Sequence, residues 1–450
     1  MYAFYSLLTA AGMFLLSPYF FVRGLMDAKY LASIRERLGW TFPEELRPSK
    51  GQQHEGAIWI HAVSVGEVLA AYPLAKRLKE RYRERRLVIS TTTATGQKLA
   101  RDRMQFADAI FYFPLDWRGP VKRALNTVRP AAVIIVETEI WPNFLCECRR
   151  MGVPVIFVNG RLSEQSFRGF RRAIAFSGGA LGGFLRRILN DATLFLMQGE
   201  EDASRLLKLG ADAERVIVAG NLKYDLDDPE ESPLSKWLAE ELARNHRQPV
   251  VVAGSVVASE EIHILKAFAE VERQFPRALL IVAPRKPDRF EETARIIAES
   301  NRDLVRRSKI ALNGTASKAL TASGSVFLLD TVGELASLYR LADAVFVGGS
   351  LVPSGGHNIL EPAAFSKAPI YGPSMNNFRE MAAKFLNAHA AIQVNTPEEL
   401  GAAWIGLLKD DMRAMRMGAA ARELVDRNRG ATARVLARIE QIVDAAGSET

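Results

Sequence analysis

The sequence predicts an α/β protein with two tandem Rossmann-like, doubly wound domains, preceded by an N-terminal membrane helix. Short apolar runs alternate with amphipathic stretches from about residue 56, stop at an acidic, proline-containing segment (225–233), and then resume. This alternation is typical of repeated βαβ units, which build a parallel sheet with helices on both faces. With 450 residues, 48% of them hydrophobic, the chain is long enough to bury two sizeable cores.

The expected strands are the apolar runs themselves. In the first domain they are residues 57–60, 87–90, 131–136, 153–158, 193–197 and 216–218, and in the second they are 249–253, 278–283, 326–329, 344–347 and 368–371. We expect a membrane anchor at residues 1–25, a first domain at 26–224, a linker at 225–235, a second domain at 236–409, and C-terminal helices at 410–450 that cross back. A cleft is expected between the two domains, at the carboxyl ends of their strands.

Composition and charge narrow the class of partner. The two cysteines, Cys146 and Cys148, lie one residue apart, so they cannot form a disulfide framework, and they lack the neighbours of a zinc site. The net charge of +8 favours acidic partners such as phosphates or anionic lipid. No nucleic-acid module is recognisable, and the basic residues do not interleave with aromatic ones as a strand-binding groove requires. We therefore expect no nucleic-acid partner.

The first 22 residues carry no charged side chain. A helix of that length would span about 33 Å, enough for a bilayer core. Tyr2 and Tyr19 lie near its ends, and Arg23 and Lys29 follow it, so the positive-inside rule places the rest of the chain in the cytoplasm. A cleaved signal peptide is disfavoured because no basic segment precedes the apolar run. The remaining alternative is a buried helix of the first domain.

A glycine-rich turn (348–362) follows the expected strand at 344–347. Gly355 and Gly356 would let the backbone approach an anion, and residues 358–361 read as the first turn of a helix whose N–H groups and dipole face it. Glu361 is placed to accept hydrogen bonds from a ribose diol. The alternative is a capping box, because Asn358 and Glu361 have its spacing, and both interpretations can hold together.

Carboxylates and a lysine follow strands of the first domain. Glu67 begins a helix, so it is either a first-turn acid stabilised by the dipole or a general base for an attacking hydroxyl. Glu137 and Glu139 end the most apolar strand, where they are costly unless paired or facing a polar site; a solvent-exposed rim is the alternative. Lys223 ends the last strand and would contact an anion or simply be a solvated loop lysine.

An arginine-rich stretch (161–187) alternates cations with large apolar groups and is interrupted at Gly178 and Gly179. Arg168, Arg171 and Arg172 lie within it. This pattern suits a helix that lies on an anionic membrane surface or grips a phosphorylated lipid. The alternative is an ordinary amphipathic helix packed over the sheet.

Two further strand ends in the second half carry polar groups. Pro284 and Arg285 end an expected strand, and the planar guanidinium of Arg285 is suited to clamp a phosphate. Gly333 and Glu334 begin a helix whose free N–H groups would meet a base or phosphate, although capping alone also explains this start.

The order of these motifs along the chain is more specific than any one of them. The segments are HAVSVGE (61–67), ETEIWPN (137–143), NGRLS (159–163), NLK (221–223), PR (284–285), GEL (333–335) and 350–362. In this order they resemble the bacterial 3-deoxy-D-manno-octulosonic acid (Kdo) transferases of lipopolysaccharide synthesis, which attach Kdo to the lipid A precursor. The resemblance implies the GT-B fold, with two Rossmann-like domains and a C-terminal helix that crosses back, at the cell inner membrane.

The resemblance also implies roles for particular residues. Glu67 matches the catalytic base, and Glu137 and Lys223 match positions of transition-state stabilisation. The segments that match those holding the CMP part of the donor are Pro284–Arg285, Val332–Gly333–Glu334 and Asn358–Ile359–Leu360–Glu361. No cofactor is implied. Two departures stand out, because Val256 and Val257 replace a usual Thr-His pair and Lys286 replaces a common histidine.

The expected reaction is an inverting, metal-independent transfer of Kdo from CMP-Kdo to a hydroxyl of the lipid A precursor (lipid IVA). No acidic pair of the DxD type occurs in the appropriate segment, since Asp227 and Asp228 lie in the linker. The alternatives are a UDP-sugar, lipid-linked glycosyltransferase, a sugar-nucleotide 2-epimerase, and a non-catalytic membrane scaffold.

Overall fold

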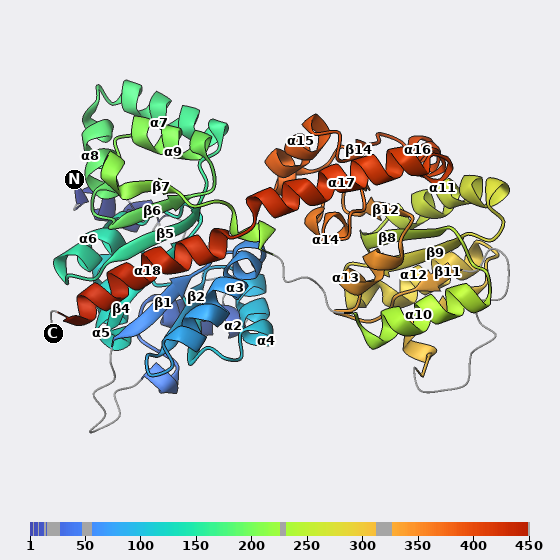
Figure 1. Cartoon of the computed structure of the whole chain (residues 1–450). Coiled ribbons are helices and arrows are strands. Elements are labelled where there is room, and N and C mark those ends of the chain that lie inside the picture. Colours follow the sequence, from blue (N-terminus) through green and yellow to red (C-terminus); the bar gives the residue numbers. More distant parts are fainter. Residues whose placement is uncertain are drawn as a thin grey trace. The chain divides into compact units, whose positions relative to one another are not determined.

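The computed structural model of the chain describes residues 1–2, 4–7, 9–12, 15, 28–46, 56–225, 231–311 and 326–448. These form two compact units, of which unit 1 comprises residues 1–225 together with 428–450 and unit 2 comprises residues 226–427 (Figure 1). Each unit is built around a parallel sheet of seven strands. The α/β class with two doubly wound sheets, predicted from the alternation of apolar runs, is confirmed.

Unit 1 has the strand order β3-β2-β1-β4-β5-β6-β7, and every neighbouring pair is parallel. Its strands are β1 (Ala57–His61), β2 (Leu87–Thr91), β3 (Ala109–Tyr112), β4 (Pro130–Val136), β5 (Val155–Gly160), β6 (Leu194–Met197) and β7 (Val216–Val218). Its helices are α2 (Ala28–Arg37), α3 (Val65–Arg81), α4 (Ala94–Arg103), α5 (Arg118–Val128), α6 (Pro142–Arg150), α7 (Glu164–Phe176), α8 (Ala180–Leu189), α9 (Glu200–Lys208) and α18 (Ala431–Ser448).

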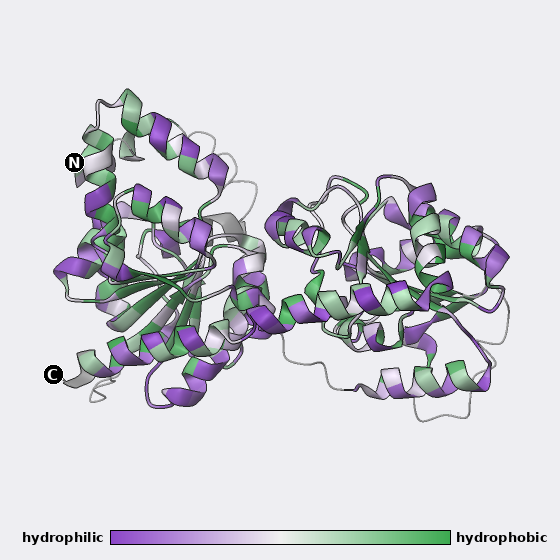
Figure 2. Cartoon of the chain, turned by 45° about the horizontal axis from the view of Figure 1, so that its top comes forward, coloured by the Kyte–Doolittle hydropathy of each residue, from purple (hydrophilic) through white to green (hydrophobic). Residues whose placement is uncertain are grey.

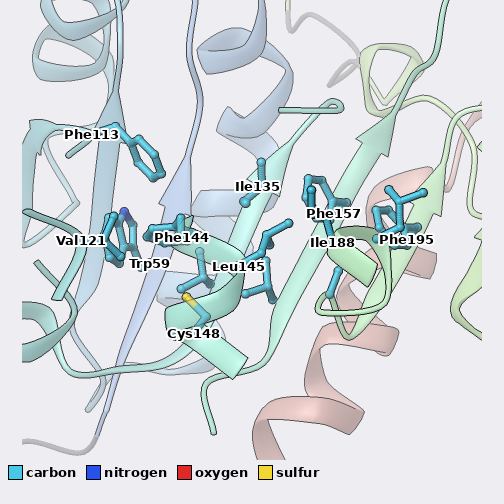
Figure 3. Close-up of a cluster of buried hydrophobic side chains, with 14 of the residues drawn as sticks. Trp59, Phe113, Val121, Ile135, Phe144, Leu145, Cys148, Phe157, Ile188 and Phe195 are labelled. Atoms are coloured by element: carbon cyan, nitrogen blue, oxygen red, sulfur yellow. The ribbon is translucent and has the colours of Figure 1, made fainter. Parts of the chain in front are cut away.

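The sheet of unit 1 is buried on both faces because alternate residues of each strand point to opposite sides. On one face, Trp59 of β1 packs edge-on against Phe144 of α6, and Phe157 of β5 stacks on Phe195 of β6, in the cluster drawn in Figure 3. On the other face, Ile58 and Ile60 pack against α3, α4 and α18. Figure 2 shows the strands of unit 1 as largely hydrophobic, which is why most of them were recognisable as apolar runs.

Unit 2 has the strand order β10-β11-β9-β8-β12-β13-β14, again with parallel pairs only. Its strands are β8 (Val250–Val256), β9 (Leu279–Pro284), β10 (Leu304–Arg306), β11 (Val326–Leu328), β12 (Ala344–Val347), β13 (Pro369–Tyr371) and β14 (Ile392–Gln393). Its helices are α10 (Pro233–Arg244), α11 (Glu260–Gln274), α12 (Phe290–Glu299), α13 (Leu335–Leu338), α14 (Leu360–Ala363), α15 (Arg379–Asn387), α16 (Pro397–Lys409) and α17 (Asp411–Asn428).

The strands lie close to the predicted ranges, with one informative difference. The sequence predicts that the first strand of unit 2 ends at residue 253, but β8 continues to Val256. The pairing register with β9 shifts between Ala253 and Val256, and Ser255 has a positive φ of 55°. Gly254 and Ser255 are accommodated in this irregularity, after which Val256 pairs with Pro284 of β9.

The predicted linker (225–235) is too long at its C-terminal end, and residues 226–230 lie outside the described residues. Helix α10 already begins at Pro233, because Ser232 caps it by accepting a hydrogen bond from the Ser235 N–H and Pro233 suits the first helical position.

The predicted C-terminal stretch (410–450) is divided between the two units. Helix α18 packs on the sheet of unit 1 through Val435, Ile439 and Val443, whereas α17 belongs to unit 2. Gly418 explains part of the attachment of α17, since a Cβ there would lie 1.9 Å from the carbonyl oxygen of Ser366. The glycine therefore allows α17 to pack closely on unit 2.

Much of the predicted anchor (1–25) lies outside the described residues, namely residues 3, 8, 13, 14 and 16–25. Among the described residues, no helix is both long and apolar enough to cross a membrane. The first residues contact unit 1: Tyr2 donates to Asp191, and the Ser6 hydroxyl donates to Asn143 over 3.1 Å. The ring of Tyr2 also lies 5.2 Å from that of Phe184 of α8.

Candidate active site

The switch point of unit 1 lies between β1 and β4. These strands are neighbours, but the chain leaves β1 toward β2 on one side and leaves β4 toward β5 on the other. Side chains that follow the two strands therefore meet at the carboxyl edge of the sheet, where doubly wound proteins bind their ligands. Glu67 follows β1 in the first turn of α3, and Glu137 directly follows β4.

Glu67 is held in one orientation and is almost removed from water. Only 6% of the residue is exposed. Its Oε2 accepts a hydrogen bond from the Val63 N–H (2.7 Å), and its Oε1 accepts one from the Ser64 hydroxyl (2.7 Å). Burial raises the pKa of Glu67 to about 7, the two hydrogen bonds oppose that shift, and the nearby Glu137 and Glu139 add to it. A carboxylate with this pKa exchanges protons near neutrality, as a general base must.

Glu137 and Lys223 lie together at the same edge. The Lys223 Nζ is 3.3 Å from the Glu137 Oε1, and both side chains are about a quarter exposed (22% and 26%). Glu137 has a positive φ of 61°, and its N–H donates to the Val158 carbonyl (2.8 Å). Lys223 sits in a short 3-10 turn capped by Asn221, whose side chain accepts from the Lys223 N–H (2.9 Å). Glu137 and Lys223 thus form an ion pair. They are not a carboxylate at a solvent-exposed rim and a separate solvated loop lysine, which were the alternative interpretations.

A buried amide network supports the Lys223 turn, and sequence reasoning did not assign it a role. Asn159, at the end of β5, is fully buried and has a φ of 55°. Its Oδ1 accepts from the Leu222 N–H (3.0 Å), and Gln198 donates to its carbonyl oxygen (3.0 Å). Asn221 donates to Gln198 in turn (2.9 Å). The signals in the sequence were the position of Asn159 at a strand end and its place in the segment NGRLS (159–163).

His61, at the end of β1, belongs to the core. It is fully buried, its ring stacks on Phe113 at 3.8 Å, and its Nδ1 lies 3.0 Å from the Ser90 hydroxyl oxygen. Burial lowers its pKa to about 3, so the ring is neutral at physiological pH. Glu139 lies nearer the site, and burial together with Glu137 raises its pKa.

The switch point of unit 2 lies between β8 and β12, and the predicted nucleotide segments follow β9 and β12, the two strands that flank β8. Pro284 ends β9, Arg285 follows it, and the turn beginning at Gly348 follows β12. Arg285 is exposed, and its backbone N–H donates to the Val256 carbonyl (2.8 Å). Burial raises the pKa of Glu361 and lowers that of His357, and the positive charge of Arg285 opposes the first shift and adds to the second, so Arg285 acts on the glycine-rich turn.

The turn at Gly355 and Gly356 needs glycine at both positions, since their φ values are 92° and 73°. The Gly356 N–H donates to the Gly349 carbonyl (2.7 Å), and a Cβ on Gly349 would lie 2.7 Å from the His357 ring. Burial, with a smaller contribution from Arg285, lowers the pKa of His357 to about 4. The imidazole is therefore neutral, and its Nε2 has no hydrogen-bond partner among the described residues.

Residues 358–361 lead into a helix, as predicted, but the helix is short. Helix α14 begins at Leu360 and ends at Ala363, so it is a single turn with little macrodipole. Asn358 accepts from the Leu360 N–H (3.1 Å) and donates to Glu361 Oε1 (3.3 Å), while Ile359 is buried. An anion here would be held by loop N–H groups and by Arg285 rather than by a helix dipole.

The segment Val332–Glu334 also opens only a single turn, α13. The Glu334 carboxylate has two partners. Its Oε1 lies 3.0 Å from the Nη2 of Arg307, and its Oε2 accepts a hydrogen bond from the Thr331 hydroxyl. Gly333 has a φ of 94°, and Val332 is exposed. A ligand would therefore meet the backbone of this segment more readily than the Glu334 side chain.

The arginine-rich stretch forms α7 and α8. In α7 only Phe167 is fully buried, while Phe170 and Ile174 are partly buried against the same core cluster, as in an amphipathic helix that packs at the surface. Arg168 pairs with Glu164 (2.8 Å), Arg171 lies 5.9 Å from the Phe167 ring centre, and Arg172 is exposed. Phe176, at the end of α7, is 98% exposed. The helix thus presents cations and a large aromatic group to its surroundings.

Two doubly wound parallel sheets in tandem, each with polar groups at its switch point, define the GT-B type of fold. The solved structure of S. aureus MnaA with UDP is similar to this chain with a TM-score of 0.51 and 16% identity, covering 87% of this chain and 97% of that one. A putative UDP-N-acetylglucosamine 2-epimerase from Listeria monocytogenes is similar with a TM-score of 0.51 and 13% identity, covering 86% and 96%. At these identities the likeness is one of fold alone.

Sequence comparison is more specific. Residues 32–226 match the family described as 3-deoxy-D-manno-octulosonic-acid transferase (kdotransferase). The 3-deoxy-D-manno-octulosonic acid transferase of Haemophilus influenzae is 33% identical over 419 residues, which cover 92% of each chain. That of Bordetella pertussis is 32% identical over 395 residues, covering 85% of this chain and 86% of the relative. The chain belongs to the Kdo transferase family and is a glycosyltransferase.

Proposed function

We propose that the chain transfers Kdo from CMP-Kdo to a hydroxyl of the lipid A precursor, lipid IVA, with inversion and without a metal ion. Its membership of the Kdo transferase family supports the donor sugar. The observation that carries the mechanism is the state of Glu67, which is 6% exposed, fixed by two hydrogen bonds and has a pKa of about 7.

In the proposed reaction, Glu67 accepts the proton of the attacking hydroxyl as the new bond to the anomeric carbon forms. The bond from that carbon to the CMP phosphate breaks on the opposite face, which inverts the configuration. Lys223, paired with Glu137, offers a cation at the same edge for the Kdo carboxylate or for developing negative charge. A base of this kind contributes roughly 10²–10⁴-fold in rate.

Unit 2 holds the nucleotide in this proposal. Arg285 neutralises the phosphate that leaves with CMP, because its planar fork binds oxyanions and no described carboxylate forms an ion pair with it. The turn at Gly355 and Gly356 brings backbone close to the ligand, and Glu361 accepts from the ribose. The neutral His357 leaves its Nε2 for one further hydrogen bond.

The membrane location is part of the proposal. The uncharged N-terminal segment would anchor the chain in the inner membrane with its catalytic units on the cytoplasmic face. The arginines of α7 and the exposed Phe176 suit an anionic lipid surface, where the lipid acceptor resides. Both features would raise the local concentration of acceptor around the enzyme.

The direct test incubates the detergent-solubilised full chain with CMP-Kdo and a tetra-acylated lipid A precursor, and reads the product mass. Added CMP is expected to inhibit transfer, and added UDP is not. The E67Q variant, which removes the proposed base, is expected to lose transfer. E147Q is its matched control, because Glu147 of α6 is also buried but pairs with Arg118 of α5 and Arg150 of α6. Absence of a Kdo-bearing product, or inhibition by UDP rather than CMP, contradicts the proposal.

A further inference from the structure

Two adjacent acids at the start of α11, Glu260 and Glu261, are buried and take no part in the reaction described above. Their exposed fractions are 0% and 1%. They follow β8, the strand that lies between β9 and β12 in the sheet. Each acid reaches toward a different neighbour of that strand.

Glu260 fills a cradle of backbone N–H groups. Its Oε1 accepts from Ser350 (2.9 Å) and Leu351 (3.0 Å), and its Oε2 accepts from Gly349 (2.7 Å) and Val257 (3.1 Å). Successive amides of this kind commonly bind a phosphate. Here a carboxylate of the chain itself occupies them, so the first part of the glycine-rich turn is closed to a ligand.

The cradle is directly joined to the turn that the proposed function assigns to CMP. The carbonyl of Gly349 accepts from the Gly356 N–H (2.7 Å), and Gly349 packs against the His357 ring. The carbonyl of Ser350 accepts from the Ser374 N–H (2.9 Å), and the Ser374 hydroxyl oxygen accepts from the Gly355 N–H (3.1 Å). Glu260 is thus linked to Gly356 through one peptide unit, and to Gly355 through a second peptide unit and Ser374.

Glu261 holds the loop on the other side of β8. Its Oε1 accepts from the Arg289 guanidinium (2.8 Å) and from the Thr293 hydroxyl (3.2 Å). Arg289 ends the short 3-10 turn that follows Pro284 and Arg285. The position of Arg285 is therefore tied to α11 through Arg289.

We infer that Glu260 and Glu261 are positioning residues that fix the glycine-rich turn and the Arg285 loop at one separation, so that both contact the same donor nucleotide. The inference rests on the proposed function, which places CMP in unit 2. Val256, at the end of β8 and before the two acids, is 1% exposed and packs in the core.

The test measures CMP binding by calorimetry, and the donor and acceptor KM values, for the full chain and three variants. E260Q keeps the volume of the side chain but turns an amide toward backbone N–H groups, so the CMP Kd and the donor KM are expected to rise about tenfold or more. E261Q is expected to raise them less, because Arg289 keeps its pair with Glu292. The acceptor KM is expected to stay unchanged in both variants.

E241Q is the matched control. Glu241 is also buried and pairs with Arg244, but it lies at the C-terminal end of α10, which leads to the amino edge of the sheet. We expect E241Q to lose stability without any change in CMP affinity. A parallel rise of the CMP Kd in E241Q would show a general effect of destabilisation and would overturn the inference.

The outcomes separate the inference from the proposed function. A wild-type chain that does not bind CMP contradicts the proposed function, and the inference falls with it. Wild-type affinity in E260Q overturns the inference alone.

If E260Q does not fold, E260D, which keeps the charge, is expected to retain part of the affinity. In the wild-type chain the amides of Gly349, Ser350 and Leu351 are expected to resist hydrogen exchange, and fast exchange there would also overturn the inference.

Discussion

The Nζ of Lys223 lies 3.3 Å from the Oε1 of Glu137, although 86 residues separate them in the chain. The pair sits beside Glu67, whose pKa is raised in part by the charge of Glu137. Lys223 therefore balances a negative charge that would otherwise act on the proposed base. This relationship gives the pair a testable influence on the pH dependence of the reaction.

Replacing Lys223 by alanine should lower kcat and shift the acidic limb of the pH–rate profile to higher pH. Without the lysine, Glu137 stands uncompensated and raises the pKa of Glu67 further, so a higher pH is needed to deprotonate the base. The profile of kcat against pH measures both effects. The matched control is K208A on α9, an exposed lysine, which should change neither quantity. A K223A profile that coincides with the wild-type profile would exclude this coupling.

Glu67 is also predicted to make the folded chain less stable at alkaline pH. Its folded-state pKa of about 7 lies above the ordinary value of 4.5, so the folded state binds the proton more tightly than the unfolded state. This tighter proton binding stabilises the folded state. The stabilisation is fully present below about pH 4.5 and is lost as the pH rises through about 7. The Tm of E67Q relative to the wild type should therefore increase between pH 5 and pH 8. A Tm difference that is constant over this range would contradict the raised pKa.

Arg285→Ala should raise the donor KM and the CMP Kd, by roughly 10-fold or more, while leaving the acceptor KM unchanged, because it removes the cation from the leaving phosphate. Arg285→Lys keeps the charge but not the planar fork, so only partial recovery is expected. The pKa of His357, which Arg285 lowers, should rise in R285A and can be followed by NMR titration. Arg295 is a suitable control, since it is exposed on α12 and pairs only loosely with Glu299. Unchanged CMP affinity in R285A would remove its assigned role.

Helix α7 is predicted to bind anionic membranes. The proposed anchor would hold the full chain on vesicles by itself, so the test uses a chain without residues 1–25. In that chain, changing Arg171 and Arg172 together to glutamate, or Phe176 to serine, should reduce co-flotation with vesicles that contain anionic lipid. The effect of the arginine changes should diminish at high salt, whereas that of Phe176→Ser should persist. CMP binding should be unaffected in both variants. Flotation equal to the wild type in the double variant would contradict a role of α7 at the lipid surface.

Most of the fold follows from local sequence because a strand buried on both faces is an almost continuous apolar run. Strand β4 is the clearest example, with the sequence PAAVIIV. The strands β3, β10 and β14 were not singled out, since each is short and lies at or next to the edge of its sheet. The helix predicted after Asn358 proved to be one turn, because tertiary packing rather than capping decides its length.

The site was predictable only in part, because local sequence reveals the ends of strands but not contacts between distant segments. Glu67, Glu137 and Lys223 stand at the ends of recognisable strands, and parallel strands bring their carboxyl ends to one edge. Glu260 differs, because three of the four amides it binds lie 89 to 91 residues further along the chain. Asn159 likewise supports a turn 63 residues away. No local pattern encodes such contacts, so the structure was needed to find them.

The most direct test of the account is the pH dependence of kcat for the wild type and E67Q, measured with saturating CMP-Kdo and acceptor. In the wild type, kcat should rise with pH and level off above about 7, because only the ionised carboxylate accepts the proton. E67Q should bind CMP normally, lose roughly 10²–10⁴-fold in kcat and show no break near pH 7. An E67Q enzyme that turns over at the wild-type rate with the same break would contradict the assignment of Glu67 as the base.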